Sequence, residues 1–307
     1  MPNDRTAAPA VALHGITKKY GRLVAVRNLH LEVIPGEIFG FLGLNGAGKT
    51  TTIRILLDLL RPTAGRAFVF GRDCQRKGLE VRAMVGYLPG ELGLYGDMTG
   101  QELLDLLARL GRYTVQPEYR AELLQKLQLS RSDLGRKLRE YSTGMKRKLG
   151  LVQAFQGDPT LLILDEPTEG LDPLMQEFFY EMLFNVQQRG RTVFMSSHVL
   201  SEVERVCDRI ALLRRGELIL LSPVEEVRRM AARRVRVLFS QDVLSGPSRL
   251  PEGHEVLEVT PRSWSIRVHG ALGSLVNTLS GLPVKDIEVY EPRLEEVLMK
   301  YYREDSL

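Results

Sequence analysis

The stretch GLNGAGKTT, from Gly43 to Thr51, constrains this chain more than any other segment. It joins a hydrophobic run, IFGFL, to a segment with helical spacing, IRILLDLL, and therefore predicts a connection from a strand to a helix. Glycines let the backbone curve until successive N–H groups converge, and a helix start adds its positive dipole end there. The spacing G-x-x-x-x-G-K-[ST], at Gly43, Gly48, Lys49 and Thr50, indicates a phosphate-binding loop.

Residue types in this loop suit separate contacts with a nucleotide. We expect Lys49 to reach the β- and γ-phosphates, and the Thr50 hydroxyl to bind the Mg²⁺ ion that bridges them. The loop by itself leaves kinases, GTPases and motor ATPases open as classes. The candidate phosphate-binding residues are Asn45, Gly46, Ala47, Gly48, Lys49, Thr50 and Thr51.

A second segment, TLLILDEPTEGLDP, ends an apolar run with two adjacent carboxylates. Because side chains alternate along a strand, we expect Asp165 and Glu166 to point to different sides where a buried strand ends. Asp165 is suited to hold Mg²⁺ through water, and Glu166 to accept a proton from the water that attacks the γ-phosphate. Both would then act on the nucleotide held by the first loop.

The pattern of apolar runs predicts an α/β fold in two parts. The runs VALHGI, AVRNLHLEV and EIFGFL predict an antiparallel β part at the N-terminus, whereas MVGYL, TLLILD and TVFMSS predict strands of a mainly parallel sheet, buried on both faces. Leucines at helical spacing predict a helical insertion at about 91–158. We place the main domain at residues 1–224 and a small α+β domain at 225–307.

Composition adds few constraints on partners. A net charge of +4 over 307 residues argues neither for nor against nucleic acid. No stretch approaches the roughly 18 to 20 apolar residues of a membrane-spanning helix, and the N-terminus lacks a signal-peptide pattern, so we expect the chain itself to be soluble. The two cysteines, Cys74 and Cys207, suit packing in a reducing compartment.

Two basic segments are interpreted as solvated surface. One is the run at 146–148, and the other comprises the arginines between 228 and 236. Charge runs are more often solvated helix faces than nucleic-acid sites, so no nucleic-acid partner is expected.

In their order along the chain, the motifs resemble the ATP-binding subunit of an ABC transporter, over roughly Ala10 to Val224. Besides the two segments above, the resemblance rests on KKYGRLVAV, YSTGM with the helical run KRKLGLVQAF, GLDP, and FMSSHVLSE. It implies a P-loop NTPase core of the ABC ATPase type, with ATP and Mg²⁺ as cofactors. A P-loop kinase or GTPase would not account for YSTGM, GLDP and the histidine together.

The resemblance also implies roles for single residues. Tyr20 would stack on adenine with Val26 packing nearby, and His198 would contact the γ-phosphate. Lys49, Glu166 and His198 are thus the candidate catalytic residues.

YSTGM implies a partner subunit. In the family this signature serves the ATP of a second chain, so two copies, as a homodimer, would enclose two ATP molecules with Ser142 and Gly144 facing the partner's γ-phosphate. Asp172 would lie in the loop that touches the opposite subunit.

Two departures from the family pattern leave alternatives open. Gly90, in YLPGELGLY, stands where most members have glutamine; either Glu91 supplies an oxygen ligand instead, or the loop acts through its backbone alone. In the signature, Thr143 replaces a glycine and Met145 a glutamine, while Ser142 is kept.

The motifs themselves do not indicate the transported substrate or its route. The resemblance to exporter ATPases implies export, of drugs, antibiotics, ions or lipids, through a separate membrane permease docked near the helical insertion and the Gly90 loop. The chain would then lie in the cytoplasm, peripheral on the inner face of the cell membrane, with the C-terminal domain supporting the dimer. The alternative is a soluble ABC ATPase acting on nucleic acid or ribosomes, although such proteins usually join two cassettes or carry coiled coils.

Overall fold

The computed structural model describes residues 8–93, 96–111, 113–230, 232–243, 254–268, 272–290, 294, 295, 297 and 298. The chain divides into two compact units, Met1–Ser222 and Pro223–Leu307. The division thus falls after Ser222, whereas the sequence placed it after residue 224. No helix within the described ranges is long and apolar enough to cross a bilayer.

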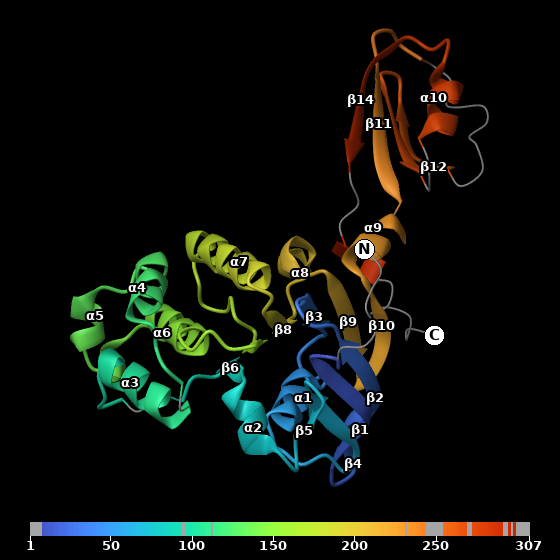
Figure 1. Ribbon diagram of the computed structural model, residues 1–307. Helices are drawn as coiled ribbons and strands as arrows, with labels where there is room; N and C mark the ends of the chain where they lie inside the picture. Colours follow the sequence, from blue (N-terminus) through green and yellow to red (C-terminus); the bar gives the residue numbers. More distant parts are fainter. Residues whose placement is uncertain are drawn as a thin grey trace. The chain divides into compact units, whose positions relative to one another are not determined.

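The first unit is built on a six-stranded central sheet with the order β10-β9-β3-β8-β7-β6 (Figure 1). The pairs β9/β3, β3/β8, β8/β7 and β7/β6 are all parallel. β3, β7 and β8 are buried along their whole length, which explains their continuous apolar sequences. The strands are β3 Ile38–Leu42, β6 Val85–Leu88, β7 Leu161–Asp165, β8 Thr192–Ser197, β9 Arg209–Arg214 and β10 Glu217–Pro223.

A second, antiparallel sheet has the order β2-β1-β4-β5 and confirms the predicted antiparallel N-terminal part. Grouping EIFGFL with that part was wrong, because β3 pairs in parallel with β8 and β9. The sequence patterns did not predict the short strands β4 and β5, because apolar and polar residues hardly alternate in AGRAFV. The strands are β1 Val11–Tyr20, β2 Leu23–Val33, β4 Ala64–Val69 and β5 Arg72–Asp73.

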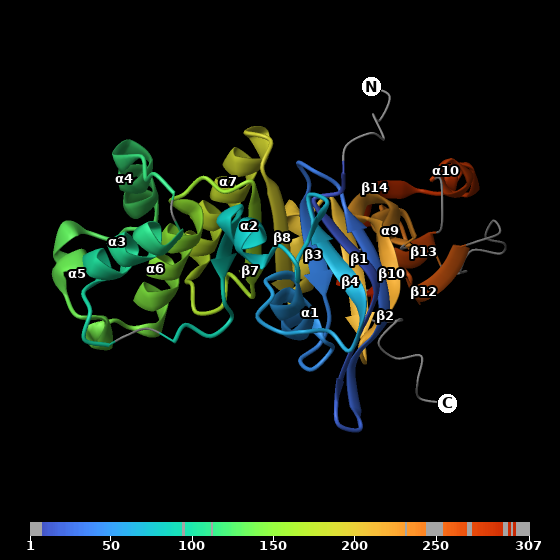
Figure 2. The same ribbon diagram turned by 60° about the horizontal axis from the view of Figure 1, so that its bottom comes forward.

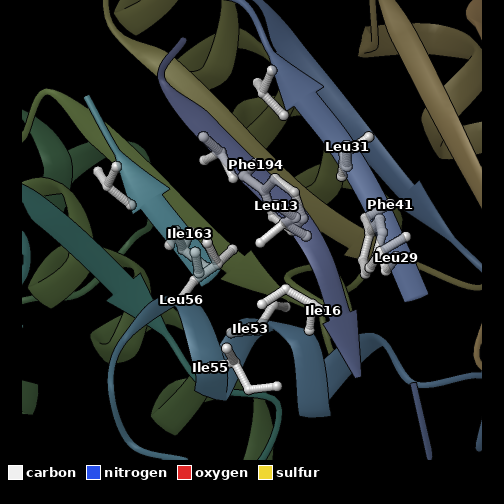
Figure 3. Packing of buried hydrophobic residues seen from close by; sticks show 14 of the residues in the cluster. Leu13, Ile16, Leu29, Leu31, Phe41, Ile53, Ile55, Leu56, Ile163 and Phe194 are labelled. Atoms are coloured by element: carbon white, nitrogen blue, oxygen red, sulfur yellow. The ribbon is translucent and has the colours of Figure 1, made fainter. Parts of the chain in front are cut away.

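The core of this unit lies between the two sheets and helix α1, Lys49–Leu56 (Figure 3). Leu13 of β1 and Phe194 of β8 are 1% and 0% exposed, and Ile53 of α1 is fully buried in the same cluster. Each such side chain contributes about 1.5–3 kcal/mol on burial. The packing therefore fixes the start of α1, directly after the glycine-rich loop.

Helices gather on one side of the central sheet, in green and yellow in Figure 1, and confirm the predicted helical insertion. Figure 2 shows the same group beside α2 and β7. The longest described helix is α7. The helices of the unit are α2 Gly78–Ala83, α3 Gly100–Gly111, α4 Pro117–Lys126, α5 Arg131–Gly135, the 3₁₀ turn η1 Leu138–Glu140, α6 Thr143–Phe155, α7 Pro173–Gln188 and α8 Leu200–Val206.

The second unit contains an antiparallel sheet with the order β12-β13-β11-β14, as the predicted α+β extension requires. Its core includes Trp264 and Phe239, whose rings meet edge to face at 4.8 Å, and Leu275 of α10. The predicted closing helix, RLEEVLMKYY, lies mostly outside the described residues. The elements are α9 Val224–Met230, β11 Arg233–Phe239, β12 His254–Thr260, β13 Ser263–Val268, α10 Gly273–Leu279 and β14 Val284–Tyr290.

Candidate functional site

The glycine-rich loop connects β3 to α1, as predicted. Gly48 has φ 107°, a left-handed conformation that favours glycine, and a Cβ there would lie 2.6 Å from the Ala25 carbonyl oxygen of β2. The Lys49 ammonium is 6% exposed and donates to the Gly43 carbonyl at 2.5 Å, which closes the loop on itself. Asn45 and Gly46 are exposed at the tip, and Ala47 is buried.

The Thr50 hydroxyl lies against the carboxylate at the end of β7. It donates to one Asp165 oxygen at 2.9 Å, while the Ser196 hydroxyl of β8 donates to the other. Asp165 is 1% exposed. One hydroxyl from α1 and one from β8 therefore meet the buried carboxylate at the C-terminal end of β7. Thr51 follows Thr50 on α1.

Glu166 joins the other two candidate catalytic residues. Its carboxylate lies 3.1 Å from the Lys49 ammonium and 2.8 Å from Nδ1 of His198, whose backbone N–H also donates to it. The predicted separation from Asp165 is present, but strand alternation is the wrong reason. β7 ends at Asp165, and Glu166 has φ 49°, so a left-handed turn redirects its side chain.

The two residues expected near adenine differ in accessibility. Tyr20, at the end of β1, is 47% exposed, and the Lys18 ammonium lies 5.1 Å from its ring centroid. Val26 is fully buried, and a Cβ on Gly48 would lie 3.2 Å from it. Val26 thus supports the loop in this conformation, and its contact with a nucleotide stays a prediction, as does stacking on Tyr20.

YSTGM forms the start of α6. Ser142 is exposed and caps the helix, since its hydroxyl accepts from the Met145 N–H at 3.2 Å. A Cβ on Gly144 would lie 3.1 Å from the Gly170 carbonyl oxygen, so α6 begins beside the segment that leads into α7. Asp172 caps α7 by accepting from the Met175 N–H at 3.0 Å.

The loop after β6 brings its backbone to the site. A Cβ on Gly90 would lie 3.4 Å from the Asp165 carboxylate, whereas the Glu91 side chain is exposed. The described residues contain no group of three or more His, Cys, Asp or Glu side chains arranged to hold a metal ion. Both interpretations of this loop therefore stay predictions.

Two glycines of this segment are expected to respond differently to alanine. At Gly86 a Cβ would collide with the Ala154 carbonyl oxygen at 2.0 Å, so Gly86→Ala should lower the free energy of unfolding by about 1–3 kcal/mol or more. At Gly90 the contact is an ordinary one, and Gly90→Ala should change it by less than about 1 kcal/mol. Urea unfolding measures both; equal losses would contradict the assigned packing.

The structure corrects the interpretation of the basic run at 146–148. Arg147 is 3% exposed and donates to backbone carbonyls at the ends of β6 and β7. Helical spacing could have predicted this burial, because Arg147 shares a face of α6 with the buried Gly150, Leu151 and Ala154.

Another missed residue is Glu202 of α8, which is 7% exposed. It accepts from the hydroxyls of Thr168 at 2.6 Å and Ser197 at 3.0 Å, next to Glu166 and His198. Burial raises the pKa of Glu202, partly offset by these hydrogen bonds. Sequence alone gave no sign of this contact, which joins segments far apart in the chain.

The fold and the site define a P-loop ATPase: a glycine loop before a helix, a hydroxyl–carboxylate pair, and a glutamate with its histidine. The family model described as "ABC transporter" matches residues 26–169. The chain belongs to the ATP-binding proteins of ABC transporters, and as such it is an ATPase.

Similar proteins cover the chain to different extents. An uncharacterized ABC transporter ATP-binding protein of Nostoc is 41% identical over 67% of this chain, which spans 62% of that protein. The daunorubicin resistance ATP-binding protein DrrA3 of Streptomyces coeruleorubidus is 33% identical, over 97% of this chain and 98% of that protein. The bacitracin transport ATP-binding protein BcrA of Enterococcus faecalis is 32% identical, over 94% and 95%.

Solved structures share the fold of the first unit. The ATP-binding subunit of an ABC transporter superposes with a TM-score of 0.67 at 29% identity, over 72% of this chain and 92% of that one. A dimeric ATP-binding cassette, MJ0796, bound to ADP and Pi, has a TM-score of 0.63 at 24% identity, over 70% and 98%.

Proposed function

We propose that two copies of this chain bind two ATP molecules between them and that hydrolysis drives export through a separate membrane permease. The proposal rests mainly on the contacts of Glu166 with Lys49 and His198, which meet at one edge of the sheet. Glu166 contacts both Lys49 and His198, and it is proposed to act on water beside a phosphate held by Lys49.

The chemistry follows from these contacts. When the γ-phosphate takes the place of Glu166 beside Lys49, the carboxylate can accept a proton from water. The water oxygen bonds to the γ-phosphorus, the bond from that phosphorus to the bridging oxygen breaks, and the electron pair leaves with ADP. His198 lies on the other side of Glu166 and is proposed to contact the γ-phosphate.

Thr50 and Asp165 fit a magnesium ion. Hydroxyl and carboxylate oxygens are ligands that Mg²⁺ prefers, and in these sites the ion usually keeps waters and binds substrate phosphates rather than a full protein cage. The distance of 2.9 Å between the two side chains suits a shared site, with Asp165 acting through water. When bound, Mg²⁺ supplies positive charge that neutralises the β- and γ-phosphates.

The homodimer is proposed from the signature. Ser142 lies exposed at the start of α6, where free N–H groups and the helix dipole favour an anion. The phosphates of the chain's own ATP would be held by the loop before α1, so the anion at α6 is proposed to be the partner's γ-phosphate. The dimeric state described for the MJ0796 cassette supports this arrangement, and the C-terminal unit is proposed to stabilise it.

A groove of about 640 Å³, lined mainly by residues of α2, β6, α3 and α6, supports the docking of a permease. Two leucines at its wall, Leu79 and Leu110, are 80% and 69% exposed, which is unfavourable unless a partner covers them. We propose that a cytoplasmic segment of the permease docks there and holds the chain at the inner face of the membrane. The named relatives for daunorubicin resistance and bacitracin transport favour a drug or antibiotic as cargo.

The test is co-expression with the membrane protein that we expect the neighbouring coding sequence to encode. The chain should sediment with membranes, and the double variant Leu79→Glu, Leu110→Glu should stay in the supernatant with unchanged basal ATPase. Leu59→Glu, at a leucine that is 59% exposed outside the groove, serves as the control and should still sediment. Salt-resistant association with ribosomes or DNA, and none with membranes, would contradict transport.

A further inference from the structure

Arg147 is a buried cation that the hydrolysis scheme does not use. It projects from α6 and makes five hydrogen bonds, of which those to Gly90 and Pro167 are both 3.1 Å long. All five acceptors are backbone carbonyl oxygens, those of Pro89, Gly90, Asp165, Glu166 and Pro167.

The number and geometry of these bonds suit arginine alone. A guanidinium carries five N–H donors in a planar fork, whereas lysine has three donors at one point. Burial lowers the pKa of Arg147, while the carboxylates of Glu169, Asp165 and Glu166 favour its charged form. Since a guanidinium stays charged in proteins, the side chain brings a fixed positive charge behind the catalytic carboxylates.

The acceptors belong to two segments that must keep a fixed position. One segment is the loop after β6, in which Gly90 stands where most members of the family have glutamine. The other contains Glu166, whose left-handed backbone conformation costs about 1–3 kcal/mol in a residue with a side chain. The Glu166 backbone is held from both sides, because Ser196 accepts from its N–H and Arg147 donates to its carbonyl. This conformation directs the Glu166 carboxylate toward Lys49 and His198.

Arg147 also lies little more than one helical turn after Ser142. A helix is stiff over that distance, so a shift of the signature moves the guanidinium and the peptide groups bound to it. We propose that Arg147 is the positioning residue through which the signature helix and the Gly90 loop set the position of Glu166. The inference rests on the proposed two-ATP dimer: an anion engaged at Ser142 would adjust the carboxylate of the same chain's own site, coupling the two hydrolytic events.

The test compares Arg147→Lys with the unaltered dimer. Lysine keeps the charge but cannot make all five bonds, so kcat should fall about 10- to 100-fold, the scale for displaced catalytic groups. ATP affinity should stay within about twofold, because the phosphate loop does not contact Arg147. The Hill coefficient for ATP should fall from above 1 to about 1, a readout that a merely structural role would not move.

Lys148→Met is the matched control, since it removes a cation from the next position of the same helix and should leave kcat and the Hill coefficient unchanged. A Hill coefficient that stayed above 1 in Arg147→Lys would overturn the inference. Loss of a cooperative unfolding transition in that variant would also overturn it, because Arg147 would then have only a structural role. Hydrolysis by the unaltered protein separates the two proposals. If the unaltered protein did not hydrolyse ATP, both the proposed function and this inference would be overturned. If it did, and Arg147→Lys retained cooperativity, the inference alone would be overturned.

Discussion

Glu166→Gln is expected to lower the rate of ATP hydrolysis by about 10²-fold or more, the usual contribution of a general base. The amide cannot accept the proton of the attacking water, but it is nearly the same size as the carboxylate. ATP binding should therefore persist, because Lys49 and the loop before α1 are intact. With hydrolysis blocked, we expect a dimer to accumulate in the presence of ATP.

Steady-state phosphate release measures the first effect, and size-exclusion chromatography with and without ATP measures the second. Glu181→Gln is the control, because Glu181 is an exposed glutamate of α7 away from the site. Unchanged turnover in Glu166→Gln would remove this residue from its role.

Lys49→Ala should weaken ATP binding itself, by about 10- to 100-fold, the scale for hydrogen bonds to a charged group. The ammonium is almost fully buried and lies between the Gly43 carbonyl and the Glu166 carboxylate, so it can approach a phosphate with little loss of hydration. Its loss also removes the contact that closes the loop.

Fluorescence titration with a labelled ATP analogue gives the Kd of this variant. Arg54→Ala removes a positive charge from an exposed position of the same helix, and it should bind ATP normally. If Lys49→Ala bound ATP as tightly as the unaltered protein, the phosphate loop would be misassigned. Lys49→Ala and Glu166→Gln should thus differ in ATP affinity and in ATP-dependent dimerisation.

The sequence predicted those parts of the site that depend on local order. The phosphate loop, the carboxylates after β7 and the histidine after β8 each follow a buried apolar strand. Because parallel strands end at one edge of a sheet, Lys49, Asp165 and His198 had to come together once the strands were recognised. The two-part fold could be predicted for the same reason, since strand and helix periods are local.

Other features depended on contacts between distant segments. The separation of Asp165 from Glu166 was predicted by alternation, but a left-handed turn produces it. That turn is held by Ser196 from β8 and Arg147 from α6. A serine or an arginine in the sequence does not by itself predict a contact with the Glu166 backbone.

By itself, the sequence determined an ATP-binding fold with a phosphate loop and a signature, because glycine spacing and buried strands act over a few residues. The tertiary structure alone decided that Arg147 is buried rather than solvated, that Val26 supports the loop, and that Glu202 joins the segment after β7 to the end of β8. The physical reason is that a charged side chain is buried only where its hydrogen-bonding groups find partners, and those partners are assembled only by the folded chain.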